Sequence, residues 1–354
     1  MFKSKISTLA VAFIAVFAFS AVLVSSEASA EITIEDSAGH TLTLDAPAER
    51  VVAMGYAFSS TIIDLGEASK IVGCDLYSTY DYNKNEKMRV LKGVHVLGTG
   101  YTKDKDPLIS GLLQLESSGK FDKTKDVVIL NNYSTTLEEG GLYDSLSPNY
   151  KVVCFGAKTY DESVTVVESI SKIIGTDSSG SVDRMKSVKQ TVIDKTEGLT
   201  DDERPSAMYI SASGNTITVY DSGIAASMIT ICGAVNAGDK GTGLASHKAD
   251  MTEILMLKPD VVFLNGNYNG TAEDFKNAYT GAEILNVVIL EKDWNNYCPS
   301  IADGLEAMYA SLYDSPLYDG EGGFFKDNAV YIGVAAVATV AVFAAAFVLV
   351  RRQG

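Results

Sequence analysis

The segment Lys125–Asn131, KDVVILN, recurs with small changes as Pro259–Asn265, PDVVFLN. In both copies an aspartate precedes four apolar residues and an asparagine, and an apolar helical pattern comes before, at Leu112–Leu115 and at Ile254–Leu257. Continuous apolar runs of this length, without alternation of polar and apolar residues, are typical of parallel strands that are covered on both faces. The repeat therefore predicts two lobes of similar architecture, each built around one such strand.

Short apolar runs and amphipathic segments alternate along the rest of residues 31–318. The predicted strands are Arg50–Met54, Ile71–Cys74, Val127–Leu130, Lys151–Phe155, Ala207–Ser211, Val261–Leu264 and Val287–Leu290. The predicted helices are Ser59–Leu65, Glu162–Ile174, Val182–Thr196, Ala225–Cys232, Thr252–Leu257, Ala272–Tyr279 and Ile301–Tyr313. This alternation predicts the α/β class with largely parallel sheets.

Two helical patterns lie between the repeats, on either side of a glycine- and serine-rich break at 175–180. The second pattern carries one apolar stripe, made of Val182, Met185, Val188 and Val192. A helix over Val182–Glu197 would be roughly 24 Å long, enough to bridge two lobes, although a surface helix inside one domain has the same pattern. We therefore expect two Rossmann-like lobes, at 31–160 and 199–318, joined through connecting helices at 161–198 by a single long backbone helix.

The first 30 residues have the pattern of a secretory signal peptide. Two lysines, Lys3 and Lys5, precede an apolar run at Leu9–Val24, and Ala28-Ser29-Ala30 forms a small-residue cleavage site. This pattern predicts a signal peptide at 1–30 and a body outside the cytoplasm. An uncleaved N-terminal anchor is the alternative.

A second long apolar segment, Tyr331–Val350, lies near the C-terminus. It contains twenty residues without a charge, and a helix of that length spans about 30 Å, the thickness of a bilayer core. Arg351 and Arg352 follow directly and place this end in the cytoplasm by the positive-inside rule. We predict a transmembrane anchor at 331–350 behind a stalk at 319–330, with a buried core helix as the alternative.

The chain carries a formal net charge of −16. Residues 31–330 contain 25 basic and 44 acidic side chains, so the net charge between the two terminal segments is −19. A strongly acidic body excludes nucleic acid as a partner, because phosphate backbones bind to cationic surfaces.

The sequence contains no recognisable catalytic motif. There is no G-x-S-x-G nucleophile elbow, and the three histidines are isolated from one another. The glycines of Gly238–Gly243 match neither a phosphate-binding loop nor a dinucleotide fingerprint, and His247 with Asp250 offers too few ligands for a metal site. We predict a binding protein rather than an enzyme, with no cofactor and no bound metal. The four cysteines allow three disulfide pairings or none.

Aromatic and amide residues gather where the predicted strands end. Because ligands of open α/β sheets bind outside the carboxyl ends of the strands, these residues are candidates for a binding site. Tyrosine and tryptophan offer a flat contact area with one polar group, which suits a bulky and partly apolar ligand. The candidates are Tyr56, Tyr77, Asn132, Tyr133, Asn267, Trp294 and Tyr297, with His247 as a further polar contact.

The stretch EITIEDSAGHTLTLDAPAERVV, residues 31–52, opens a series of motifs that continues to Asp75. The residues that stand in order in this series are Asp36, Gly39, Leu42, Leu44, Pro47, Arg50, Val51, Val52, Leu65, Gly66, Ile71, Val72 and Gly73. Further motifs are LKPDVVFLN at 257–265 and GLEAMYASLYDSPLY at 304–318. The series resembles the periplasmic-type solute-binding proteins of ABC transporters, in the helical-backbone family for iron–siderophore, haem and cobalamin uptake.

The resemblance implies that a metal chelate, such as a ferric siderophore, haem or a cobalamin-like corrinoid, is held in the cleft between the lobes. It also implies delivery to an ABC permease that is driven by a cytoplasmic ATPase. Family members carry a docking glutamate on each lobe, eight residues before the aspartate of the P-D motif. That position is Thr252 here, and the nearest acidic candidates for docking are Glu253 and, in the first lobe, Glu116. The alternative is a surface sensory or adhesion ectodomain that kept the fold without transport.

Overall fold

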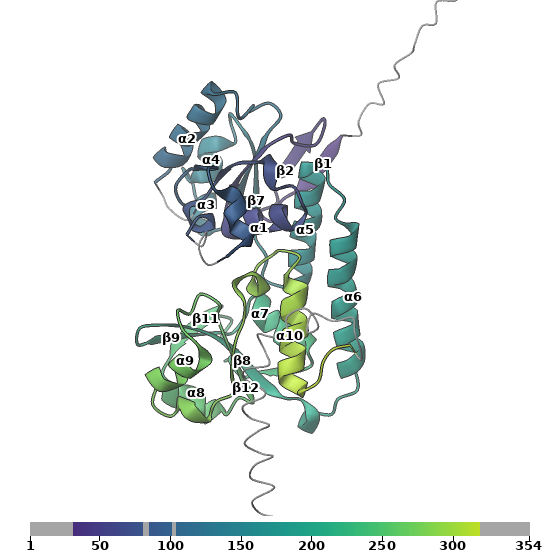
Figure 1. Cartoon of the computed structure of the whole chain (residues 1–354), viewed down its shortest axis with the longest axis vertical. Helices are drawn as coiled ribbons and strands as arrows, with labels where there is room; N and C mark the ends of the chain where they lie inside the picture. The colour runs from purple at the N-terminus through teal and green to yellow at the C-terminus, as the bar shows by residue number, and fades with distance from the viewer. Residues whose placement is uncertain (1–30, 81–84, 101–103, 319–354) are drawn as a thin grey trace, which may run out of the picture.

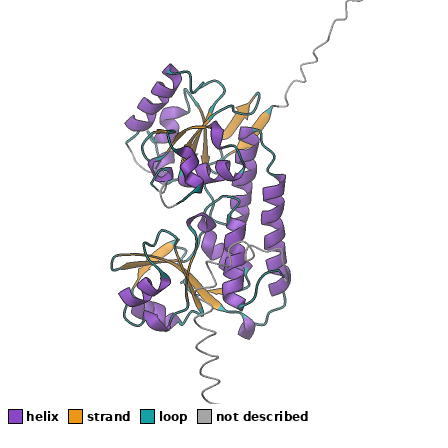
Figure 2. Cartoon of the chain, viewed as in Figure 1, coloured by secondary structure: helices purple, strands orange, loops and turns teal. Residues whose placement is uncertain are grey.

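The computed structural model describes residues 31–80, 85–100 and 104–318. The predicted signal peptide, stalk and C-terminal anchor lie outside these ranges. Within them, no helix is both long enough and apolar enough to cross a membrane. The described chain forms two α/β lobes beside a pair of long helices (Figure 1). Figure 2 shows that each lobe contains a sheet with helices packed around it.

The first lobe contains a five-stranded parallel sheet with the order β5-β4-β3-β6-β7. Its strands are β3 (Val51–Met54), β4 (Ile71–Cys74), β5 (His95–Val96), β6 (Val127–Asn131) and β7 (Lys151–Phe155). A separate antiparallel hairpin consists of β1 (Ile32–Glu35) and β2 (Thr41–Leu44). The helices of this lobe are α1 (Tyr56–Asp64), α2 (Asp106–Ser117), α3 (Ser134–Leu137) and α4 (Leu142–Leu146). Every residue of β3 and β6 is buried, as expected for strands covered on both faces.

The second lobe contains a mixed six-stranded sheet with the order β11-β9-β8-β12-β13, and β10 pairs with β8 as well. β12 is parallel to β8 and β13, whereas β9 is antiparallel to β8 and β11. The strands are β8 (Ser206–Ser213), β9 (Thr216–Tyr220), β10 (Val235–Asn236), β11 (Ser246–Ala249), β12 (Val261–Leu264) and β13 (Val287–Ile289). The helices are α7 (Ile224–Ile231), α8 (Met251–Leu257), α9 (Ala272–Ala278) and α10 (Ile301–Tyr313).

The repeated aspartate plays the same part in both lobes. Asp126, just before β6, accepts a hydrogen bond on Oδ1 from the backbone amide of Arg50 at 3.0 Å. Asp260, just before β12, accepts one on Oδ2 from the backbone amide of Ser206 at 2.7 Å. Arg50 directly precedes the neighbouring strand β3, and Ser206 is the first residue of the neighbouring strand β8. The repeat therefore satisfies the first amide of the adjacent strand in each lobe, which would otherwise lack a partner.

Two antiparallel helices, α5 (Tyr160–Ile174) and α6 (Ser179–Thr196), join the lobes. The amide of Tyr160, at the start of α5, donates to Ser227 Oγ of α7 in the second lobe at 3.0 Å. Near the other end of α5, the carbonyl of Ile173 accepts from the amide of Ala48 in the first lobe at 2.7 Å. α5 therefore contacts both lobes.

The expected helix over Val182–Glu197 is present as α6, which returns to the second lobe after Gly175 ends α5 in the left-handed conformation. Arg184 of α6 pairs with Asp303 and Glu306 of α10 at 2.6 and 2.8 Å. The long helix expected from the sequence is therefore accompanied by a second helix, α5, which packs beside it.

The four cysteines, Cys74, Cys154, Cys232 and Cys298, are all buried and free. Burial raises the pKa of the Cys74 and Cys298 thiols to about 12 and the pKa of the other two as well. Of the pairings that the sequence left open, the structure contains none.

Candidate ligand-binding site

Residues that follow strands of both sheets line two adjoining cavities between the lobes. The larger, of about 490 Å³, is lined by Tyr56, Tyr77, Tyr80, Tyr209, Asn265, Gly266, Asn267, Glu291, Lys292, Asn295 and Asn296. The smaller, of about 310 Å³, shares Tyr56, Tyr209, Asn295 and Asn296 with it. We refer to the two cavities together as the interlobe cleft. Its position at the carboxyl ends of the strands is where α/β sheets bind their ligands.

Tyrosine is the dominant residue of the interlobe cleft. The tyrosines that line it are Tyr56, Tyr77, Tyr80, Tyr133, Tyr209, Tyr220 and Tyr297. Among the described lining residues, only Glu291 and Lys292 carry ionisable groups that are charged near neutral pH. Burial raises the pKa of Glu291, and the neighbouring Asp293 raises it further. The interlobe cleft is therefore close to neutral although the body as a whole is strongly acidic.

The cation among the described lining residues of the interlobe cleft is held against an aromatic ring. Lys292 Nζ lies 3.8 Å from the centre of the Tyr56 ring. A cation over the face of a ring is attracted by the negative centre of the π system. The Tyr56 ring therefore stabilises the positive charge of Lys292 inside the cleft.

The polar groups around Tyr209 are fixed by hydrogen bonds. Asn265 and Asn295 both donate from Nδ2 to the Tyr209 hydroxyl, at 2.5 and 2.8 Å. Asn295 Oδ1 in turn accepts from the amide of Ala225 at the start of α7, at 2.9 Å. Burial raises the pKa of Tyr209, so its phenol stays neutral. These contacts pre-orient the amides that a ligand would meet.

A charged network joins the lobes beside the interlobe cleft. Lys87 Nζ of the first lobe lies 2.7 Å from Asp64 Oδ1 and 3.0 Å from Asp293 Oδ2 of the second lobe. Ser300 donates to the other oxygen of Asp64 at 2.9 Å. Burial lowers the pKa of Lys87, but Cys298 and the two carboxylates outweigh it, so the net pKa is raised. Lys87 is therefore a cation that ties the lobes together.

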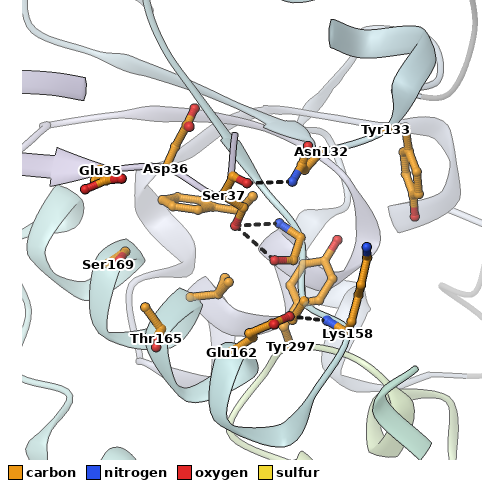
Figure 3. A pocket seen from close by; sticks show the side chains of 14 residues that line it. Glu35, Asp36, Ser37, Asn132, Tyr133, Lys158, Glu162, Thr165, Ser169 and Tyr297 are labelled. Carbon is orange, nitrogen blue, oxygen red and sulfur yellow. Dashed lines mark hydrogen bonds between the residues drawn. The ribbon is translucent and has the colours of Figure 1, made fainter. Parts of the chain in front are cut away.

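Five of the residues proposed from the sequence line the interlobe cleft, namely Tyr56, Tyr77, Tyr133, Asn267 and Tyr297. Asn132 instead donates to the carbonyl of Ser37 at 2.9 Å and lines a third cavity, of about 580 Å³, which runs along α5 (Figure 3). Trp294 is packed into the core beside Gly304, where a Cβ would lie 2.6 Å from Trp294 Cβ, and it lines none of these three cavities.

The remaining candidates also lie away from the cleft lining. His247 stands in β11, with Nδ1 2.5 Å from Asp221 Oδ1 and Nε2 3.4 Å from Glu253 Oε1. Glu253 additionally pairs with Lys240 at 2.5 Å. Glu116, at the end of α2, accepts a hydrogen bond from the Tyr150 hydroxyl at 2.5 Å. Each of these side chains is held by a partner in its own lobe.

Sequence reasoning missed several lining residues. Tyr80 and Asn265 stand in the same strand-end clusters as the chosen candidates, and Lys292 and Asn295 lie within two residues of Trp294, so the signal was present. Tyr209 is different because it stands inside β8, where a tyrosine has the pattern of an ordinary core residue. No feature of the sequence singles it out.

Neither a protein-family model nor a curated protein matches the sequence. Solved structures do match. Ceue of Helicobacter pylori with Ni(II) bound has a TM-score of 0.62 at 12% identity, over 80% of this chain and 89% of that chain. The periplasmic haem-binding protein RhuT of Roseiflexus sp. has a TM-score of 0.58 at 14% identity, over 75% and 98%.

The periplasmic vitamin B12 binding protein BtuF of Vibrio cholerae matches with a TM-score of 0.54 at 16% identity, over 75% of this chain and 97% of that chain. The chain has the helical-backbone fold of periplasmic binding proteins. These periplasmic binding proteins hold ligands as different as Ni(II), haem and vitamin B12. The shared fold therefore indicates where a ligand binds, whereas the residues that line the cleft determine which ligand binds there.

Proposed function

We propose that this protein is an extracytoplasmic solute-binding protein that captures a metal chelate in the interlobe cleft for an ABC importer. The observation that carries the proposal is the tyrosine-lined cleft at the strand ends of both lobes. The segments at 1–30 and 331–350 would export the body and hold it at the cytoplasmic membrane. The protein would act by binding alone, without catalysis.

The lining of the interlobe cleft favours a particular kind of chelate. Tyrosine rings offer flat apolar contact, and the amides of Asn265, Asn267 and Asn295 offer hydrogen bonds to polar edges. Lys292 is the single cation among the described lining residues, and Glu291 lines the same cleft, so little positive charge is left for an anionic ligand. A cobalamin-like corrinoid or an uncharged ferric hydroxamate therefore suits the cleft better than haem, which carries two propionates.

Glu116 and Glu253 are the proposed contacts with a permease. They stand on α2 and α8, which precede the equivalent strands β6 and β12 in the two lobes. Corresponding helices in two similar lobes would meet a permease of two-fold symmetry, with Glu116 near the end of its helix and Glu253 in the first turn of its own. Replacing both by glutamine should abolish uptake in cells and leave ligand affinity unchanged.

The ligand is tested with the full chain in detergent and with Trp294 as the fluorescent reporter. Cobalamin, an uncharged ferric hydroxamate and haem are titrated in turn. Asn295 and Asn296 line the interlobe cleft directly after Trp294 in the chain, so a bound chelate that absorbs in the near ultraviolet should quench its emission. Saturable quenching with micromolar or tighter affinity supports the proposal. The absence of binding across the whole panel would favour the sensory or adhesion alternative.

A further inference from the structure

Three side chains that commonly bind metals lie together in the first lobe, outside the interlobe cleft. Asp36 and His40 belong to the turn between β1 and β2, and Cys154 stands on β7. A carboxylate oxygen, an imidazole nitrogen and the thiol sulfur of these residues all lie within 4.8 Å of one another. Cys154 lies 118 residues after Asp36 in the chain, so the fold itself brings it to the other two donors.

We propose that Asp36, His40 and Cys154 bind one transition-metal ion of the zinc class, independently of any ligand in the interlobe cleft. His40 Nδ1 lies 3.1 Å from Asp36 Oδ2. Tetrahedral zinc with bonds of about 2.0–2.1 Å to nitrogen and oxygen holds such a pair about 3.3 Å apart, so the two donors need to move little. Three protein donors leave the fourth position open for water.

The identity of the donors selects the class of ion. Sulfur and imidazole ligands favour zinc and its neighbours among the transition metals, whereas magnesium and calcium prefer oxygen alone. The four-residue spacing of Asp36 and His40 lets one short turn supply two of the donors. Cys154 then supplies the third from an edge strand of the sheet.

The group is held in place by contacts around it. Asp36 Oδ1 accepts hydrogen bonds from the amides of Ala38 and His40, both at 2.9 Å, and Oδ2 accepts one from the amide of Cys154 at 2.8 Å. The His40 ring stacks on the Tyr143 ring of α4, with centroids 3.8 Å apart and an angle of 10° between the planes. Fixed donors of this kind raise the affinity for a metal ion, because less ordering is needed on binding.

An ion could reach these donors from the solvent. The Asp36 side chain is fully buried, whereas the side chain of His40 is 34% exposed. The Asp36 carboxylate points away from α5 and from the third cavity in Figure 3, so the donors face the side of α4 instead. Binding would displace the thiol proton of Cys154 to solvent and leave the remaining imidazole proton on His40 Nε2. One proton would be released for each ion, and the ion would tie the β1–β2 turn to β7.

Cobalt is the probe for the test, because a bond between Co²⁺ and a thiolate gives a charge-transfer absorption band in the near ultraviolet. The full chain is reduced, freed of metal and titrated with Co²⁺ in detergent. We expect one equivalent to produce the band, Zn²⁺ to displace it, and the midpoint of thermal unfolding to rise with either ion. A wild-type chain without the band would overturn the proposal.

Matched variants identify the ligands. Cys154→Ser should lose the band, and His40→Gln should weaken Co²⁺ binding by more than about 100-fold, beyond the loss caused by removing a partner that only orients a ligand. Cys232→Ser and His95→Gln, at a buried cysteine and a histidine outside the group, should leave the band and the affinity unchanged. If Cys154→Ser does not fold, His40→Gln decides alone, because its side chain is partly exposed. Unchanged affinity in His40→Gln, or a band that persists in Cys154→Ser, would contradict the assignment.

Discussion

Tyr297 of the second lobe donates a hydrogen bond from its hydroxyl to Asn131 Oδ1 of β6 in the first lobe, at 2.9 Å. Asn131 in turn donates from Nδ2 to the carbonyl of Met54 at the end of β3, at 2.7 Å. Two glycines leave room for these hydrogen bonds. A Cβ at Gly55 would lie 2.9 Å from Asn131 Nδ2, and a Cβ at Gly100 would lie 2.3 Å from the Met54 carbonyl oxygen. Asn131, the residue that ends the first copy of the repeat, thus connects the two lobes next to the interlobe cleft.

Tyr297→Phe should remove this connection and leave the buried Asn131 oxygen without a donor. We expect the free energy of unfolding, measured in urea, to fall by about 1–2 kcal/mol. Tyr279→Phe is the control, because the Tyr279 hydroxyl donates to the Gly214 carbonyl at the protein surface and water can replace it. Equal losses of unfolding free energy in the two variants would show that the hydrogen bond between the lobes stabilises the protein no more than a surface hydrogen bond does.

Lys87→Met should destabilise the contact between the lobes, because Asp64 and Asp293 would remain largely buried without a cation. Breaking a pair of this kind costs about 3 kcal/mol of unfolding free energy. Lys186→Met is the control and should have no measurable effect, since Lys186 pairs with Glu168 on the open surface.

The pH dependence of the same variant tests the cause. The folded pKa of Lys87 is raised above its ordinary value of 10.5. The stability difference between wild type and Lys87→Met should therefore be complete below pH 10.5 and disappear as the pH rises through the higher pKa of the folded protein. A difference that grows with alkaline pH would contradict the ion-pair explanation.

Gly304→Ala should force α10 away from the segment that carries Trp294. The new Cβ would lie 2.6 Å from Trp294 Cβ and 2.9 Å from its carbonyl oxygen. We expect a loss of about 1–3 kcal/mol in unfolding free energy and a shift of the tryptophan emission maximum. Gly180→Ala, in α6 with open space around it, should instead stabilise the protein by up to about 1 kcal/mol. Similar behaviour of the two variants would argue against close packing at Gly304.

The core strands of the fold were predictable from the sequence, because burial on both faces leaves an uninterrupted apolar run. The seven predicted strands are present, and α10 has the expected bounds, Ile301–Tyr313. The strands that were missed, β1, β2, β5, β9, β10 and β11, are short or lie at sheet edges and hairpins, where the burial pattern is broken. A search for continuous apolar runs does not detect such segments, because strands covered on one face, such as β2 and β9, alternate buried and more exposed residues.

The candidate site was predictable only in part. The rule that ligands bind at strand ends led to Tyr56 and Tyr77, which line the interlobe cleft, but it could not separate residues that line the cleft from their neighbours. Trp294 and Asn295 are adjacent in the chain, yet one is packed in the core and the other lines the cleft, because a short 3₁₀ turn at Lys292–Asn295 directs their side chains differently. Side-chain direction in a turn depends on tertiary packing rather than on sequence spacing.

The claim that the interlobe cleft binds the ligand is tested most directly with the double variant Tyr77→Ala/Tyr80→Ala. Its affinity for a chelate that binds the wild type is measured. These two rings are in edge contact, and both are exposed, so their removal should leave the fold intact. Ile284→Ala removes a similarly exposed apolar side chain outside the cleft and serves as the control. We expect binding in the double variant to weaken at least about tenfold, equivalent to about 1.4 kcal/mol, with no change in the control. Equal affinity in the wild type and the double variant would contradict a ligand site in the interlobe cleft.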